Sequence, residues 1–185
     1  MTGQIPDKLI YNRSSYSIVG LKGEGLPSPL DFGLKPISPH TANWRGFIMI
    51  YTIAENHLIV QEMNVTVKDL EKKPPLINNV NPETKKKGII HLTYNNLKLK
   101  TQFTGKVLIA KDFIDSMYVH MGFQSPISFE TVIELKISNG TLIKVTDFSE
   151  IMKKYRKLSS TDGKLGPREN IQEWVARTFS LDYDF

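Results

Sequence analysis

The side chains best suited to acid or base chemistry gather around His120. Tyr118 lies two residues before this histidine, and Gln124 lies four residues after it. Asp112 and Asp115 come shortly before Tyr118. In an extended strand, residues two apart point to the same face, so Tyr118 and His120 are expected to line one pocket. Imidazole titrates near neutral pH, which suits a general acid or base. The simpler interpretation makes His120 an edge or core residue held by one hydrogen bond.

Trp44 and Arg45 form the second candidate, because they follow a loop rich in proline and glycine and precede an expected central hairpin. Rigid strands commonly present binding surfaces in this way, and Trp and Arg dominate interface energies. In the competing interpretation, Trp44 fills the core and Arg45 pairs with a carboxylate. The candidate binding residues are Trp44, Arg45, Tyr118, His120 and Gln124.

Standard signatures of catalysis and of cofactor binding are absent from the sequence. The chain has no cysteine, and its four histidines never fall at the paired spacing of metal ligands. Gly20, Gly23 and Gly25 have the spacing G-x-x-G-x-G, which is not the dinucleotide fingerprint. There is no Walker loop, no G-x-S-x-G elbow and no H-E-x-x-H motif. We therefore expect no metal and no cofactor. The histidines are His40, His57, His91 and His120.

Basic residues gather in short clusters, in a chain with a net charge of +5 and a pI near 9.3. Such a charge permits an acidic partner without requiring one. Tyr155 lies within the last cluster, but helical periodicity places it on an apolar stripe that faces the core. The lysines would then face water, which disfavours a nucleic-acid footprint. The clusters are Lys72–Lys73, Lys85–Lys87 and Lys153–Lys157.

Two hairpins are expected to position these residues. Around Ser138-Asn139-Gly140, apolar and polar residues alternate on both sides of the turn. A three-residue loop here places Leu135 opposite Ile143 and Glu134 opposite Lys144, which gives one apolar face and one charge pair. The other hairpin runs from Gly46 to Met63 with the loop Ala54-Glu55-Asn56, and both of its faces are apolar. A strand pair of that kind is covered on both sides and central.

Further period-2 segments bring the expected total to about eight to ten strands. Residues 20–43 and 72–88 lack periodicity and are expected to be long loops, of which the first is ordered. The fold class is therefore mainly β, an antiparallel β-sandwich or a partly closed β-barrel. The further strand segments are Leu9–Tyr11, Tyr16–Val19, Ile89–Thr93, Leu97–Phe103, Lys106–Lys111 and Met117–Met121.

The pattern changes to helical periodicity after residue 146. Asp147 is the expected N-cap of a first helix. A second helix is expected to start near Pro167. Both would pack on the β-rich part, residues 1–146, within a single domain of 185 residues. The apolar stripe of the first helix consists of Phe148, Ile151, Met152 and Tyr155.

The run Trp44-Arg45-Gly46-Phe47 and the later run Tyr118 to Pro126 resemble a pattern in short, uncharacterised bacterial proteins rich in β-structure. Tyr51-Thr52-Ile53 and Leu58-Ile59-Val60 extend the first run. The resemblance implies one compact domain. It implies no activity and no catalytic residues.

These observations lead us to expect a protein that acts by binding, with either a protein partner or a small molecule on the β-scaffold. One alternative is a hydrolase or lyase centred on His120 in a barrel mouth. The other is nonspecific nucleic-acid binding through the lysine clusters. With no signal peptide and no long apolar run, we expect a cytoplasmic protein without membrane contact. Alternating Leu181, Tyr183 and Phe185 would suit an added strand, on the same sheet or in a dimer.

Overall fold

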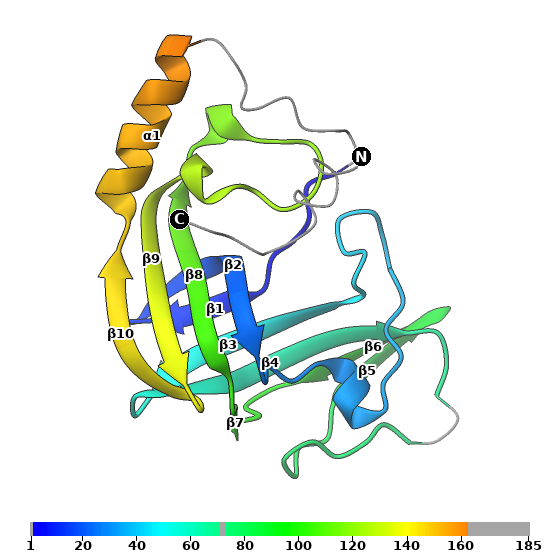
Figure 1. The fold of residues 1–185 in the computed structure, drawn as a ribbon. Helices are drawn as coiled ribbons and strands as arrows, with labels where there is room; N and C mark the ends of the chain where they lie inside the picture. The colour runs from blue at the N-terminus through cyan, green and yellow to red at the C-terminus, as the bar shows by residue number, and fades with distance from the viewer. Residues whose placement is uncertain (1, 71–72, 163–185) are drawn as a thin grey trace.

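The structure is a computed structural model that describes residues 2–70 and 73–162 (Figure 1). Ten strands form a single sheet, in the order β10-β9-β8-β2-β1-β3-β4-β6-β5, with β7 paired to β4. The strands are β1 (Lys8–Tyr11), β2 (Ser14–Glu24), β3 (Phe47–Ala54), β4 (His57–Val67), β5 (Glu83–Lys87), β6 (Ile89–Tyr94), β7 (Leu99–Lys100), β8 (Thr104–Phe113), β9 (Phe129–Ser138) and β10 (Thr141–Asp147). Helix α1 (Ser149–Asp162) follows β10, and short 3₁₀ turns span Pro29–Phe32, Asp115–Met117 and Pro126–Ser128.

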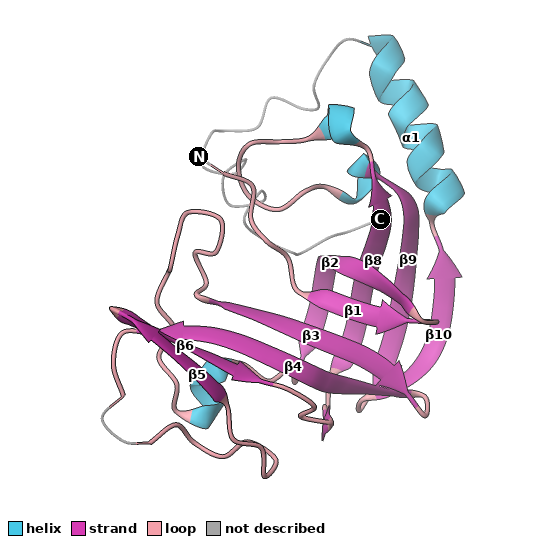
Figure 2. Cartoon of the chain, turned by 180° about the vertical axis from the view of Figure 1, so that it is seen from behind, coloured by secondary structure: helices cyan, strands magenta, loops and turns pink. Residues whose placement is uncertain are grey.

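The sheet curls into a partial ring (Figures 1 and 2). The tips of the β3–β4 and β9–β10 hairpins meet, and Thr141 pairs with His57. The expected mainly β fold is confirmed, but the architecture is one partly ringed sheet rather than a barrel. The sheet is also not purely antiparallel, because β1 runs parallel to β3.

Both hairpin loops contain two residues, so the predicted three-residue loops are wrong. Ser138 pairs with Thr141, and Ala54 pairs with His57. The turn residues have positive φ angles, 44° and 78° at Asn139 and Gly140, and 49° and 62° at Glu55 and Asn56. Two successive residues with positive φ form the type I′ turn, whose twist matches that of the strands.

The predicted partners along β10 are also wrong. A bulge lies between Leu142 and Lys144, so Glu134 pairs with Thr146 instead of Lys144. Its carboxylate is instead 3.3 Å from the Nζ atom of Lys106 on β8. Because the bulge adds one residue to β10, every later pair moves by one position. Ile143, at the bulge, is 54% exposed rather than part of an apolar face.

Apolar side chains form two clusters on opposite faces of the sheet. The larger cluster fills the inside of the ring and includes Leu9, Met49, Tyr94 and Phe103. The smaller cluster joins Leu108, Ala110, Phe129 and Val132 to Met152 of α1. Strands β8 and β9 are therefore covered on both faces near α1 and on one face elsewhere.

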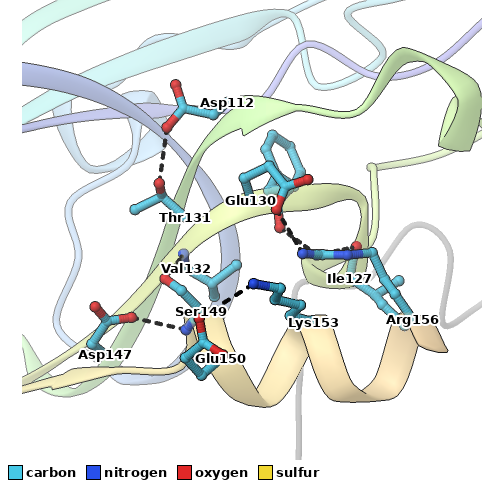
Figure 3. Close-up of polar contacts among 11 residues, drawn as sticks. Asp112, Ile127, Glu130, Thr131, Val132, Asp147, Ser149, Glu150, Lys153 and Arg156 are labelled. Carbon is cyan, nitrogen blue, oxygen red and sulfur yellow. Dashed lines mark hydrogen bonds and ion pairs between the residues drawn. The ribbon is translucent and has the colours of Figure 1, made fainter. Parts of the chain in front are cut away.

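Helix α1 is confirmed where the sequence predicts it, but a different face packs on the sheet. Met152 is buried, whereas Ile151 and Tyr155 are 42% and 50% exposed. Arg156 faces inward and donates to the carbonyl oxygens of Ile127 and Phe129, at 3.0 and 2.7 Å (Figure 3). Residues 148, 152 and 156 thus form the packed stripe, with a spacing of four. The second expected helix, from Pro167, lies outside the described residues.

The start of α1 is held by side chains of its first turn (Figure 3). Ser149 Oγ accepts a hydrogen bond from the Val132 amide at 3.0 Å. Asp147, just before the helix, accepts a hydrogen bond from the Ser149 amide at 2.8 Å. Hydrogen bonds from the Ser149 hydroxyl and from this amide lower the pKa of the Asp147 carboxyl.

Four segments differ from their predicted structure. Residues 20–24, predicted as the start of a loop, form the end of β2. Residues 117–121 form the end of a 3₁₀ turn and a loop instead of a strand, and residues 97–103 contain only the two-residue β7. Conversely, β5 lies within the predicted loop 72–88. Among the described residues, β5 pairs only with β6, so it is an edge strand. Charged residues such as lysine are tolerated on edge strands, so β5 lacks the apolar alternation from which a strand is predicted. The loop after β2 is ordered as expected, with Leu34 only 2% exposed.

Candidate functional site

A pocket of about 250 Å³ opens where β8 ends and β9 begins. Three parts of the chain form its walls: the N-terminal arm, the middle of β2, and the segment that connects β8 to β9. Most of its wall is apolar or aromatic. The lining residues are Gln4, Pro6, Ser17, Ile18, Val19, Phe113, Tyr118, Phe123, Gln124 and Phe129.

Aromatic rings on the two strand ends form one side of this pocket. Phe113 and Phe129 pair across β8 and β9, and their ring centroids lie 5.1 Å apart. Tyr118 meets Phe113 edge to face at 6.4 Å, and His120 meets Tyr118 edge to face at 4.9 Å. Edge-to-face contacts of this kind are favourable for aromatic rings, so the four rings form a continuous row.

Gln124 holds the loop that carries Tyr118. Its Oε1 atom accepts a hydrogen bond from the Val119 amide at 2.9 Å. Its Nε2 atom donates to the Val119 carbonyl at 2.7 Å. The side chain therefore replaces a strand partner for Val119. One N–H group and one oxygen lone pair of this amide remain outside the pairing with Val119.

Gln4 joins the N-terminal arm to the segment that connects β8 to β9 and to the loop before β3. Its backbone amide donates to the Gly122 carbonyl at 2.8 Å, and its side-chain amide donates to the Thr41 carbonyl at 2.8 Å. Its Oε1 atom accepts from the Trp44 amide at 3.1 Å. Next to it, the Gly3 amide donates to the Tyr118 hydroxyl at 3.2 Å. Gln4 is only 7% exposed, so these bonds form inside the wall.

Arg45 supports the wall from behind and is neutralised there. Both of its terminal nitrogens donate to the Asp7 carboxylate at 2.8 Å. The guanidinium also lies 4.7 Å from the ring centroid of Phe47 and 5.5 Å from that of Phe123. Asp7 Oδ1 accepts a further hydrogen bond from the Met49 amide. The bidentate pair fixes Arg45 in one position, and Phe123 stands between it and the pocket.

The ion pair also acts on Tyr51, which is 3% exposed in the core. Burial raises the pKa of the Tyr51 phenol, and the negative charge of Asp7 raises it further, while Arg45 lowers it. The phenol therefore stays neutral well above the usual range of a tyrosine.

The five sequence-predicted residues lie in one region, but only two of them line the pocket. Tyr118 and Gln124 do so. Arg45 supports Phe123, and His120 packs on the far side of Tyr118. Trp44 is 51% exposed, so the competing interpretation that it fills the core is wrong, whereas the ion pair that the same interpretation gives Arg45 is present.

Sequence reasoning missed several residues that build the site. Phe113, Phe129 and Phe123 form much of the wall, and Asp7 and Gln4 hold it in place. Phe113 and Phe129 could have been found from the sequence, because they stand at the two ends of the irregular segment that connects β8 to β9. Asp7 and Gln4 carried none, since the partners that hold the wall lie 37 or more residues away in the sequence.

The geometry needed for acid–base catalysis by His120 is not formed. His120 is exposed, and the described part of the chain gives it no hydrogen bond to Asp112 or Asp115. Asp112 instead accepts from Thr131 at 2.8 Å (Figure 3). A general base needs an orienting partner within hydrogen-bond reach, whereas the contact that the described residues give the His120 ring is with the aromatic ring of Tyr118.

A second, more polar pocket of about 190 Å³ lies between the loop at residues 39–43 and the outer face of β4 and β6. His40 and His91 both line it, and the Nδ1 atom of His91 is 2.9 Å from the Thr66 hydroxyl. Within residues 2–70 and 73–162, no group of three or more His, Cys, Asp or Glu side chains is placed to hold a metal ion.

No family model, curated protein or solved structure matches this chain. This result is consistent with the uncharacterised family that the Trp44-Arg45-Gly46 pattern resembles. Among the described residues, the helical segments lack the length and apolar character needed to cross a membrane.

Proposed function

We propose that the protein binds a small, neutral and largely apolar molecule in the pocket between Tyr118, Phe113 and Phe129. The observation that carries this proposal is the wall itself, in which four aromatic rings line a cavity and the Gln124 side chain already pairs with the Val119 backbone. Ligand sites typically combine an apolar lining with a few placed polar groups.

The size of the pocket limits the ligand. A cavity of about 150 Å³ holds benzene, so a pocket of about 250 Å³ accommodates roughly ten non-hydrogen atoms. A single or fused aromatic ring with one hydrogen-bonding group fits this size.

The charges around the pocket select against ions. Arg45 offers no free positive charge, because Asp7 pairs with both of its terminal nitrogens. An anion in the pocket would therefore lose its contacts with water and gain no charged partner. This loss costs about 2 kcal/mol or more.

Indole is a suitable probe, because it has nine non-hydrogen atoms and one N–H group. In two-dimensional NMR titrations of the full chain, we expect saturable shifts at the amides of residues 118–124. Ser17 lines the pocket, so Ser17→Phe is expected to fill it and abolish these shifts. Ser15→Phe is the matched control, because Ser15 is an exposed serine on the same strand and face. Equal binding by both variants would refute the pocket as the binding site.

A protein partner is the second candidate, because Trp44, Tyr118 and Val119 are 51%, 43% and 41% exposed in the same region. Trp44→Ala separates the two functions. Indole binding is expected to survive this change, because Trp44 does not line the pocket. An interface centred on Trp44 would instead lose affinity.

A further inference from the structure

Four lysines form a straight row across the outer face of the sheet. Lys22 on β2 pairs with Lys106 on β8, which pairs with Lys136 on β9, which pairs with Lys144 on β10. Residues directly opposite each other in neighbouring strands point to the same face, so all four side chains stand on one side. All four lysines are exposed. We call these residues the lysine row.

The lysine row lies beside the part of the sheet that α1 covers. Strands β2, β8, β9 and β10 lie next to one another, and α1 continues beyond the end of β10 (Figure 1). On the same face as Lys106, Leu108 is buried in the cluster that packs against Met152 of α1. From this contact α1 runs away from the row, because Arg156 donates to the carbonyl oxygens of Ile127 and Phe129 at the start of β9.

The lysine row is unfavourable for folding. Like charges directly opposite each other in a sheet are destabilising, and the row contains three such pairs. Glu134 compensates Lys106 at 3.3 Å, and Glu24 is on the same strand and face as Lys22. Across the part of the chain that the structure describes, Lys136 and Lys144 have no ion pair. A bound polyanion would remove the repulsion that the fold leaves in place.

We propose that the lysine row binds the phosphodiester backbone of a nucleic acid, which runs across the strands at the foot of α1. Neighbouring strands are about 4.8 Å apart, so the row presents four positive charges over roughly 14 Å. A linear polymer with regular negative charges matches this arrangement.

The neighbouring residues agree with contacts to phosphate alone. Thr104 and Ser138 are exposed and lie two residues from Lys106 and Lys136 on the same face, and hydroxyl groups commonly contact phosphate. On β2, β8, β9 and β10, no residue two positions away from a lysine of the row is aromatic. The binding is therefore expected to be independent of sequence and steeply dependent on salt.

The sequence concealed the lysine row because its members are 84, 30 and 8 residues apart. It shares no residue with the clusters Lys85–Lys87 and Lys153–Lys157. None of its lysines lines the aromatic pocket, so binding of nucleic acid and binding of a small molecule can be tested independently.

Fluorescence anisotropy with labelled 20-nucleotide single-stranded and duplex DNA and RNA tests the proposal. Four phosphate contacts predict a slope of log K against log[salt] of about −2.8 for single strands and −3.6 for duplexes. For single strands, affinity should then fall about 50-fold between 50 and 200 mM KCl.

The deciding variant is the double substitution Lys136→Gln and Lys144→Gln. Its slope for single strands should drop to about −1.4, which is a fall of about 7-fold over the same salt range. The matched control is Lys85→Gln and Lys86→Gln on β5, which removes the same charge elsewhere and should leave the slope unchanged. Because the double variant relieves repulsion, its thermal midpoint at low salt should not fall below that of the wild type.

Three outcomes would overturn the proposal. The first is an equal loss of slope in both double variants, which would mean that only the net charge matters. The second is the absence of binding at 25 mM salt. The third is binding that depends on Lys136 and Lys144 only with vesicles containing phosphatidylserine or with polyglutamate, which would identify a different partner.

Discussion

The two ends of the curled sheet are built in opposite ways. At the hairpin junction, where residues 55–58 meet residues 139–142, backbone groups pair with backbone groups. The Leu58 amide donates to the Gly140 carbonyl at 2.8 Å, and the Leu142 amide donates to the Asn56 carbonyl at 2.9 Å. The two bonds are equivalent. In each, the last residue of one turn accepts from a residue that lies two positions after the other turn.

At the pocket end, side chains do the corresponding work. Gln124 closes its loop through the Val119 backbone, and Gln4 links the N-terminal arm to Trp44. Aromatic faces remain partly exposed there, as in Tyr118 at 43%. The difference shows where a ligand can bind. At the junction the two turns close directly on each other, with the Asn56 side chain also donating to the Leu142 carbonyl, whereas the side-chain scaffolding at the pocket end leaves an apolar cavity open.

The largest expected effect is at the hairpin junction. A Cβ atom at Gly140 would overlap the carbonyl oxygen of Thr101, and Gly140 has a φ of 78°. We expect Gly140→Ala to lower the free energy of unfolding by about 3 kcal/mol or more, measured by urea denaturation. Gly33→Ala is the matched control, because Gly33 has a φ of 73° but open space around it. It should cost only about 1 kcal/mol. Equal losses would mean that the junction is not tightly packed.

The next effect is at the pocket end. Arg45→Met leaves the Asp7 carboxylate, whose side chain is 10% exposed, without its ion pair. We expect a loss of about 2 kcal/mol in the free energy of unfolding. Adding Asp7→Asn should recover part of this loss, because the stranded charge is removed. Lys153→Met breaks the exposed pair with Glu150 and should cost less than about 0.5 kcal/mol. Additive effects of the Arg45 and Asp7 substitutions would show that their ion pair does not organise this end.

A smaller effect depends on pH. Burial raises the pKa of Tyr51 well above its usual value and raises that of Tyr94 to about 12. Above about pH 10 these tyrosines ionise in the unfolded chain but not in the folded one. Their contribution to the free energy of unfolding is therefore fully present below pH 10 and is lost as the pH rises. Each tyrosine should contribute about 1.4 kcal/mol of loss per pH unit.

The two tyrosines separate in the same experiment. The contribution of Tyr94 should level off near pH 12, whereas that of Tyr51, beside Asp7, should continue beyond it. Urea midpoints of Tyr51→Phe and Tyr94→Phe between pH 9 and 13 measure these slopes. An unchanged slope in Tyr51→Phe would contradict the raised pKa that burial gives the Tyr51 phenol.

Period-2 patterns predicted the two hairpins and most of the strands, and the change of period predicted α1, because these signals are local. The same reasoning missed β5, whose Lys85, Lys86 and Lys87 gave no apolar alternation. It also extended Met117–Met121 into a strand that does not form, since apolar residues in a packed loop look like those of a strand. The candidate site was predicted only in part, through Tyr118 and Gln124.

By itself, the amino-acid sequence determined which segments become strands, where the glycine and asparagine turns lie, and that the chain carries an excess of positive charge. Only the tertiary structure decided which strands are neighbours. That decision joined Asp7 to Arg45 and aligned the lysine row across β2, β8, β9 and β10. The physical reason is that alternation specifies the face of a strand but not its partner. A single bulge, such as the one at Ile143, is enough to change every pair that follows it.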